Sequence, residues 1–270
     1  MVVQHNLSAI NTNRQMGVVT NALQKSTEKL SSGYKINRAA DDAAGLSISE
    51  KMRSQIRGLN KASDNAQDGI SLIQVAEGAL NETHSILQRM NELATQAAND
   101  TNTSVDRQSI KDEIKQLNEE LDRISSTTQF NKQDLLTGGF SGKLQVGALE
   151  GQTMDVKISL AVSANGLNVS AVEVSTNAKA GAAMQSIQDA IESVSKQRSK
   201  LGAIQNRLEH TINNLDTNAE NTQAAESRIR DTDMADEMVQ YSKNNILSQA
   251  GQSMLTQANQ QTQGVLSLLQ

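Results

Sequence analysis

Apolar residues recur every seven positions through a long stretch of the chain, from about Gly45 to Ala98. A strict seven-residue repeat is typical of an α-helix packed in a left-handed bundle. One uninterrupted helix over this stretch would be about 80 Å long. A second series beside the first consists mostly of small residues, which let a neighbouring helix approach closely. The first series is Met52, Leu59, Ala66, Ile73, Leu80, Leu87 and Ala94, and the second is Ala62, Gly69, Ala76, Thr83, Met90 and Ala97.

A shorter helix is predicted before the long one, over residues 2–32. It ends at Gly33, because glycine is the favoured residue just past a helix C-terminus. A polar connector follows, and it contains Asp41 and Asp42. We interpret this pair chiefly as exposed turn carboxylates. The alternative is that they cap the N-terminus of the long helix, where negative charge is favourable.

Further helices are predicted after the long one. An amphipathic helix of about 25 residues follows Asn102 and folds back on the long helix. The heptad pattern returns near Ala180 as a third long helix, and a polar stretch at 227–233 separates it from a final helix. The third long helix carries the series Ile187, Val194, Leu201, Leu208 and Leu215.

The period changes from seven to two in the segment at about 130–175. Apolar and polar residues alternate at 144–146 and again at 154–160, with the glycine-containing stretch GALEGQT between them. This pattern predicts a β-hairpin. Asn165-Gly166 is a further turn signal, and Leu167, Val169 and Ala171 are predicted to add another strand. The fold class is therefore mainly α: an elongated antiparallel helical bundle or coiled coil with a small β-hairpin insert.

The helices at the two ends carry apolar residues that a lone pair of helices cannot bury fully. Ordering such ends costs chain entropy, which only sufficient burial can offset. We therefore expect the ends to be mobile in a single molecule and to form a coiled-coil inner core when copies of the chain surround them. The packing residues predicted for this core are Leu7, Met16, Leu23, Leu30, Leu247, Met254, Val265 and Leu268.

Composition excludes several classes of function. The chain has no cysteine and no proline, and its net charge of −5 offers no basic stripe for nucleic acid. No apolar run is long enough to span a membrane, and the N-terminal residues lack the apolar core of a secretory signal. His5, His84 and His210 stand far apart, and GGFSGK misses the phosphate-loop pattern at both ends. We predict no catalytic residue, no metal and no cofactor, so the protein is not expected to be an enzyme.

Both ends of the chain carry long, specific motifs. HNLSAINTNRQ and LQKSTEKLSSGYKINRAADDAAGLSISEKMRSQIRGL at one end, and RIRDTDMADEMVQYSKNNILSQAGQSMLTQANQQTQGVLSLLQ at the other, resemble the terminal regions of bacterial flagellin. The resemblance covers about residues 1–135 and 180–270. It implies a short form that lacks the large outer domains, with residues 1–42 and 232–270 as the inner-core domain and residues 43–231 as the outer-core domain.

The resemblance also implies a function, a route and partners. The chain would be a structural subunit that self-assembles into the extracellular flagellar filament used for motility. It would be exported unfolded by the flagellar type III apparatus, without a cleaved signal peptide. Its partners would be other copies of itself, the export chaperone, and the filament cap and hook-junction proteins. No nucleic acid or membrane partner is implied.

Two motifs are similar to stretches that innate immune receptors recognise in flagellins. QRMNELATQAAN resembles the Toll-like receptor site, and it places Gln88, Arg89 and Leu93 on neighbouring turns with Glu113 on the facing helix. We expect Leu93 to be exposed beside Arg89, because an arginine next to an exposed leucine is a typical anchor pair for a protein interface. The alternative is that these residues serve filament packing or face solvent. The ending VLSLLQ resembles the leucine-rich end that NAIP receptors read, through Val265, Leu266, Leu268 and Leu269. Core packing is the simpler role for those leucines.

Two other protein classes share parts of these patterns. The hook-filament junction protein has flagellin-like ends, but the DDAAGLSISEKM and VLSLLQ motifs favour flagellin. The cytoplasmic bundle of a chemoreceptor is also rich in heptads and poor in proline. That bundle has no β insert, so the alternation from Leu144 to Leu160 argues against it.

Overall fold

The computed structural model describes residues 6–268, with side chains described through Gln261. Along the chain the helices are α1 (Leu7–Ser32), α2 (Ala43–Ala97), α3 (Ser104–Thr127), α4 (Asn177–Arg230) and α5 (Met234–Leu268). Strands β1 (Gln129–Phe130), β2 (Gln133–Asp134), β3 (Phe140–Gln145) and β4 (Thr153–Ile158) lie between α3 and α4. The prediction of a mainly helical fold with a β insert is confirmed. None of the described helices is both long enough and apolar enough to cross a membrane.

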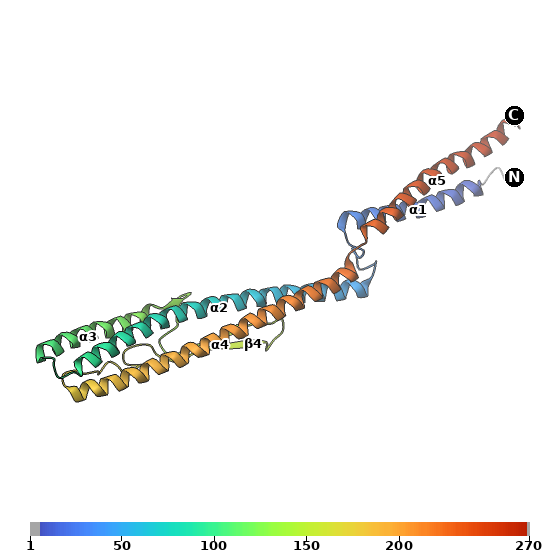
Figure 1. Cartoon of the computed structure of the whole chain (residues 1–270). Helices are drawn as coiled ribbons and strands as arrows, with labels where there is room; N and C mark the ends of the chain where they lie inside the picture. The colour runs from blue at the N-terminus through green and yellow to red at the C-terminus, as the bar shows by residue number, and fades with distance from the viewer. Residues whose placement is uncertain (1–5, 269–270) are drawn as a thin grey trace. The chain divides into compact units, whose positions relative to one another are not determined.

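The chain forms two compact units. Unit 1 is Met1–Ser54 together with Asn221–Gln270, and unit 2 is Gln55–Glu220. In unit 1, α1 and α5 run side by side in opposite directions (Figure 1). In unit 2, α2, α3 and α4 lie alongside one another, and β3 and β4 pack on the α2 and α4 pair (Figure 1).

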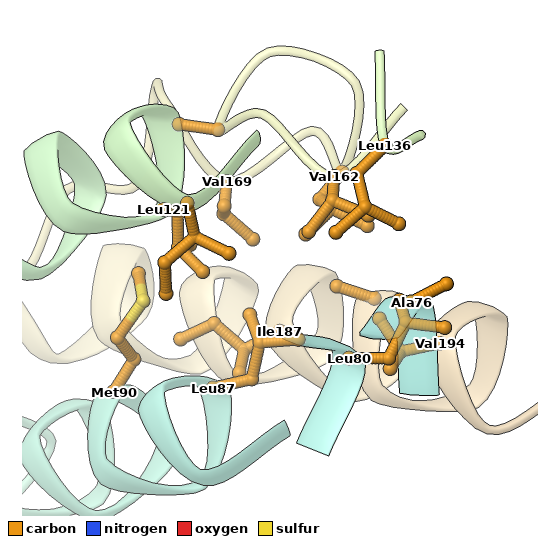
Figure 2. Close-up of a cluster of buried hydrophobic side chains, with 14 of the residues drawn as sticks. Ala76, Leu80, Leu87, Met90, Leu121, Leu136, Val162, Val169, Ile187 and Val194 are labelled. Atoms are coloured by element: carbon orange, nitrogen blue, oxygen red, sulfur yellow. The ribbon is translucent and has the colours of Figure 1, made fainter. Parts of the chain in front are cut away.

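The core of unit 2 follows the predicted heptads. Leu80 and Leu87 of α2 and Ile187 and Val194 of α4 are fully buried. Figure 2 shows them meeting Leu121 of α3 and residues of the segment that follows it. The small series on α2 is buried as well, so the close approach that it predicted is confirmed. All six of its members are buried: Ala62, Gly69, Ala76, Thr83, Met90 and Ala97.

Two glycines of α2 make room for the β-hairpin. A Cβ at Gly58 would lie 2.9 Å from the Cβ of Ala148, and one at Gly69 would overlap the Cδ1 of Leu144. The amide of Asn65, between these glycines, donates a hydrogen bond to the carbonyl of Gln145 at 3.1 Å. The hairpin therefore docks on the face of α2 where Gly58 and Gly69 leave room for it.

The predicted hairpin is confirmed as β3 and β4, which pair antiparallel from Phe140 with Ile158 to Gln145 with Thr153. A second small hairpin, β1 with β2, was not predicted. Its turn places Asn131 and Lys132 at φ values of 48° and 63°. Such angles favour a tight hairpin, but asparagine followed by lysine is a weaker signal than asparagine followed by glycine.

The predicted third strand at Leu167, Val169 and Ala171 is wrong. The backbone there closes turns on itself, with the N–H of Val169 donating to the carbonyl of Ala164 at 2.9 Å. Asn168 has φ of 58°, which interrupts an extended strand. Leu167 and Val169 are nevertheless buried. The alternation predicted correctly which residues are buried, but the turns that begin near Asn165 extend further along the chain than predicted.

The helix ends agree with their capping residues. Gly33 follows α1 with φ of 73°, and its N–H donates to the carbonyl of Lys29 at 2.8 Å, which confirms the predicted C-cap. Asp42 accepts a hydrogen bond from the N–H of Gly45 at 2.9 Å and so caps α2. Asp41 closes the connector by accepting from the backbone N–H groups of Arg38 and Asn37, and the first of these bonds does most to lower its pKa. Both aspartates are exposed, so the two interpretations hold together.

Candidate assembly and recognition surfaces

The α1 and α5 pair is held at several points along its length. The amide of Asn6 donates to the carbonyl of Ala258 at 2.9 Å. Near the middle, a Cβ on Gly251 would lie 3.8 Å from the Cγ of Met16. At the end near the connectors, Lys29 and Glu237 form an ion pair at 3.4 Å. From the first of these contacts to the last, the paired residues advance along α1 and go back along α5, so the pair keeps one antiparallel register.

This pair leaves many apolar side chains uncovered. Of the predicted packing residues, Met16, Leu23 and Leu30 are only half-buried. Leu7 is 70% exposed and Met254 is 57% exposed. The side chains of Val265, Leu266, Leu268 and Leu269 lie outside the described residues. Other exposed apolar residues of α1 and α5 are Ile10, Val18, Met234, Met238, Val239, Ile246 and Leu247.

A groove of about 460 Å³ lies between the two helices. Its lining combines apolar and uncharged polar side chains, including Thr12, Met16, Val19, Leu247 and Met254. Exposed apolar surfaces of this kind are typical of sites where proteins bind one another. The prediction that a helix pair cannot bury these residues agrees with the structure.

The predicted receptor patch is partly assembled. Arg89 on α2 donates from Nε and Nη2 to the carboxylate of Glu113 on α3 at 3.0 and 2.9 Å, and from Nη1 to Glu92 at 3.2 Å. The hydrogen bond to Glu113 is the largest cause that raises the pKa of Arg89. Gln88 lies one position away and contacts the ring of His84. The patch is therefore a polar, exposed surface across two helices.

Leu93 does not belong to this exposed surface. It is 2% exposed and packs in the core of unit 2, so the expectation of an exposed leucine beside Arg89 is wrong. The reason is that α2 packs against both α3 and α4. A helix with two neighbours buries a wider stripe than the two heptad series identified in the sequence, neither of which contains Leu93.

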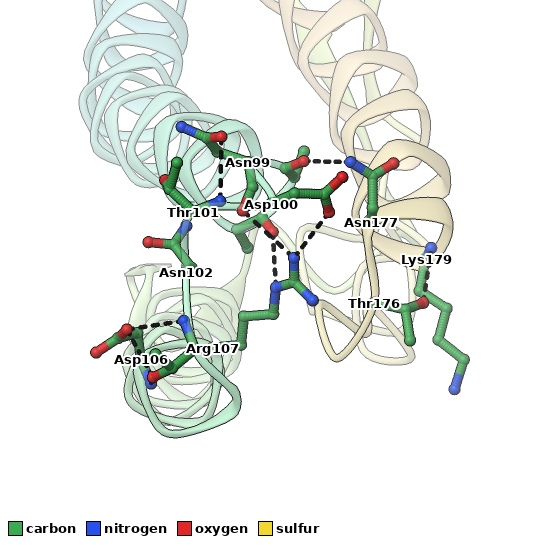
Figure 3. Close-up of polar contacts among 12 residues, drawn as sticks. Asn99, Asp100, Thr101, Asn102, Asp106, Arg107, Thr176, Asn177 and Lys179 are labelled. Carbon is green, nitrogen blue, oxygen red and sulfur yellow. Dashed lines mark hydrogen bonds and ion pairs between the residues drawn. The ribbon is translucent and has the colours of Figure 1, made fainter.

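A network at the α2–α3 corner holds the patch in place (Figure 3). Arg107 of α3 donates to the carbonyls of Ala97 and Asn99 at 3.2 and 3.3 Å and pairs with Asp100 at 3.3 Å. It thereby satisfies carbonyl groups at the C-terminus of α2. The side-chain amide of Asn177, the first residue of α4, donates to the carbonyl of Ala98.

Thr103 and Asp106 form a reciprocal capping box at the start of α3. The side chain of Asp106 accepts from the backbone N–H of Thr103 at 2.9 Å, and the hydroxyl of Thr103 accepts from the N–H of Asp106 at 3.4 Å. This capping box was not predicted, although a threonine three residues before an acidic residue is a signal for it in the sequence. Because this box and Arg107 set the start of α3, Glu113 arrives opposite Arg89.

A second polar cluster, which was not predicted from the sequence, lies in unit 1. The Tyr34 cluster consists of Tyr34, Arg53, Glu226 and Arg230. Arg53 donates to the Tyr34 hydroxyl at 2.8 Å and to the carboxylate of Glu226 at 3.0 Å. Its members come from sequence positions far apart, so no local motif could have found them.

The described residues show no grouping of His, Asp or Glu side chains that could hold a metal ion. His84 and His210 therefore meet no further ligands, and His5 lies outside the described residues. The fold consists of a long helical bundle and a helix pair with uncovered apolar side chains, which is the architecture of a helix-packing structural protein.

Comparison with known proteins identifies the family. The model of the bacterial flagellin N-terminal helical region matches residues 3–141, and that of the C-terminal helical region matches residues 184–269. The chain belongs to the bacterial flagellin family. It is 56% identical over 271 residues to the flagellin of Halalkalibacterium halodurans, and 52% identical over 304 residues to the flagellin of Bacillus subtilis strain 168. Each alignment covers 100% of both chains.

A solved structure agrees with this result. The crystal structure of Bacillus cereus flagellin is 33% identical to this chain, with a TM-score of 0.51. The match covers 60% of this chain and 94% of that chain. The chain is accordingly a structural subunit of the bacterial flagellar filament, an extracellular homopolymer that serves motility. The full-length flagellin relatives also decide against the hook-filament junction and chemoreceptor alternatives.

Proposed function

We propose that the α1 and α5 pair is the surface through which copies of this chain assemble. Residues 1–42 and 232–270 then form the inner core of the filament, and residues 43–231 form the surrounding outer-core domain. The observation that carries the proposal is the row of exposed apolar side chains on both helices, from Leu7 to Met254. Unit 2 keeps its own apolar core buried, so it has far less to gain from neighbours.

Removal of residues 232–270 tests this assignment. We expect the shortened chain to keep a cooperatively unfolding middle, because the large buried cluster lies within unit 2. It should form no filaments under conditions where the full chain does, as seen by negative-stain microscopy. Filament growth by the shortened chain would refute the proposal.

A second proposal concerns the receptor patch. Gln88, Arg89 and Glu113 form a polar surface that is open to a partner, with the side chains of Arg89 and Glu113 52% and 45% exposed. We propose that this surface binds the Toll-like receptor that senses flagellin. Leu93 supports the patch from the core and does not contact the receptor.

The test is receptor binding by Arg89→Ala, with Arg123→Ala as the matched control. Arg123 lies on α3, pairs with Glu120 and is similarly exposed at 61%. We expect Arg89→Ala to weaken binding of the receptor ectodomain at least tenfold, because an interfacial arginine is a typical hot spot. Equal effects of the two substitutions would remove the patch from the interface.

Export and the remaining partners are further proposals drawn from the family. We propose that the chain leaves the cell unfolded through the flagellar type III apparatus, without a cleaved signal peptide. The absence of proline and cysteine supports this, since neither slow isomerisation nor disulfide formation delays refolding outside. Cells that lack the apparatus should retain the intact chain, and secretion there would contradict the route.

The exposed apolar residues of α5 also fit a chaperone that shields them before export, and helix-in-groove binding is the expected mode. Deletion of 232–270 should abolish co-purification with that chaperone. The filament cap and hook-junction proteins would contact the same assembly surface at the filament ends. Recognition of Val265, Leu266, Leu268 and Leu269 by NAIP receptors stays a prediction from the sequence.

A further inference from the structure

The connectors on either side of the terminal helix pair are joined to each other. The N–H of Lys35 donates to the carbonyl of Arg230 at 2.7 Å, and the N–H of Thr232 donates to the carbonyl of Gly33 at 3.0 Å. These bonds pair Tyr34 with Asp231 as an antiparallel bridge. The bridge therefore fixes which residue of one connector faces which residue of the other.

The Tyr34 side chain is held by two arginines. The guanidinium carbon of Arg53 lies 5.1 Å from the ring centroid, and that of Arg230 lies 4.7 Å away. Both distances are within the range of cation–π attraction. Glu226, whose side chain is 9% exposed, accepts a hydrogen bond from Arg53 and offsets the positive charge. The Nε of Arg230 is buried and has no hydrogen-bond partner among the described residues, which fits stacking on the ring.

The bridge and the helix pair share one antiparallel register. Beyond the bridge, Lys29 faces Glu237, Met16 faces Gly251 and Asn6 faces Ala258, without an offset between connectors and helices. Along the pair itself, the residues that line the groove around Gly251 are all uncharged, so none of them forms an ion pair that a slip of one heptad would break. The cluster at the base of the pair is thus placed to choose the register.

We propose that Tyr34 is a positioning residue for assembly, whose contacts with Arg53 and Arg230 set the register in which α1 and α5 pair. This inference rests on the proposed role of the pair as the assembly surface. A pair slipped by a heptad would present a different apolar pattern to neighbouring copies, even though it stayed helical.

The cysteine-free chain allows a direct test. The Cβ of Met16 lies 3.9 Å from an ideal Cβ at Gly251, within the range found in disulfides. In the full chain with Met16→Cys and Gly251→Cys, the equilibrium constant for disulfide formation in a glutathione buffer measures the native register. The pair Leu23→Cys and Gly251→Cys measures a register slipped by one heptad, because Leu23 follows Met16 by seven positions.

We expect Tyr34→Leu to lower disulfide formation at the native pair about tenfold relative to the slipped pair, from the loss of the two ring contacts. Tyr34→Phe keeps the ring and should retain most of the preference, losing only the hydroxyl bond to Arg53. Tyr241→Leu is the matched control, since that half-buried tyrosine of α5 lies outside the cluster. It should leave the ratio unchanged.

An unchanged ratio in Tyr34→Leu would overturn the inference. So would an equal fall at both cysteine pairs, because that result means general loosening of the helices and not a loss of register. Circular dichroism of each variant checks that α2 and α4 remain helical. The assay reads the register in free subunits, whereas filament growth by the chain that lacks residues 232–270 would refute the assembly surface, so the two failures are distinguishable.

Discussion

Replacing Val239 by threonine tests whether an exposed apolar residue of α5 is an assembly contact. Val239 lies on α5 and is 65% exposed in the single chain. Full burial of a valine side chain contributes about 1.5 to 3 kcal/mol, so covering its exposed part by a neighbouring copy contributes about 1 to 2 kcal/mol. Threonine has nearly the same shape, and its hydroxyl can bond to the preceding helical turn. The lost burial should therefore dominate the effect.

A loss of about 1 to 2 kcal/mol per subunit raises the critical concentration for filament growth about 5- to 30-fold. The matched control is Val105→Thr, because Val105 is 72% exposed on α3 of unit 2. Sedimentation of filaments at a series of subunit concentrations measures the critical concentration of each variant. If Val239→Thr and Val105→Thr assemble at the same concentration, the reasoning from exposed apolar surface on α5 fails.

Leu93→Ala should lower the free energy of unfolding by about 2 to 5 kcal/mol, measured by urea denaturation, because it leaves a cavity in the core; a loss below about 1 kcal/mol would place Leu93 at the surface. Gly33→Ala should destabilise the end of α1 by about 1 to 2 kcal/mol, because Gly33 has positive φ. Gly17→Ala inside α1 should instead stabilise the helix. Amide hydrogen exchange of α1 distinguishes the effects of these two substitutions. The hydrogen bonds from Thr103 lower the pKa of Asp106 in the folded chain, so its contribution is present above about pH 4 and is lost as pH falls through the lowered pKa. Asp106→Asn should therefore flatten the acid side of the stability profile, and an unchanged profile would contradict the capping box.

The helices could be predicted because their signals are local and repeated. Each turn of α2 or α4 carries its own apolar residue, so a wrong interpretation of one residue does not change the prediction of the helix. The strand predicted at Val169 failed because a short alternation also fits a buried turn. The hairpin of β3 and β4 was predicted correctly, because apolar and polar residues alternate over a longer stretch on both sides of its loop.

Candidate sites were harder to predict than elements. Arg89 and Glu113 meet as expected, since the fold-back of α3 on α2 follows from the short connection. The exposure of Leu93 was misjudged, because it depends on how many helices pack around α2. That number is a property of the whole bundle and not of the repeat in one helix.

The sequence by itself determined the secondary structure, the apolar surplus at both ends and the family, because periodicity and long motifs survive without knowledge of distant contacts. Only the tertiary structure decided which connector residues face one another. Tyr34, Arg53, Glu226 and Arg230 become neighbours when the first turns of α2 meet the last turns of α4. Their attraction falls off within a few ångströms. Its effect therefore exists only once folding has brought the two ends of the chain together.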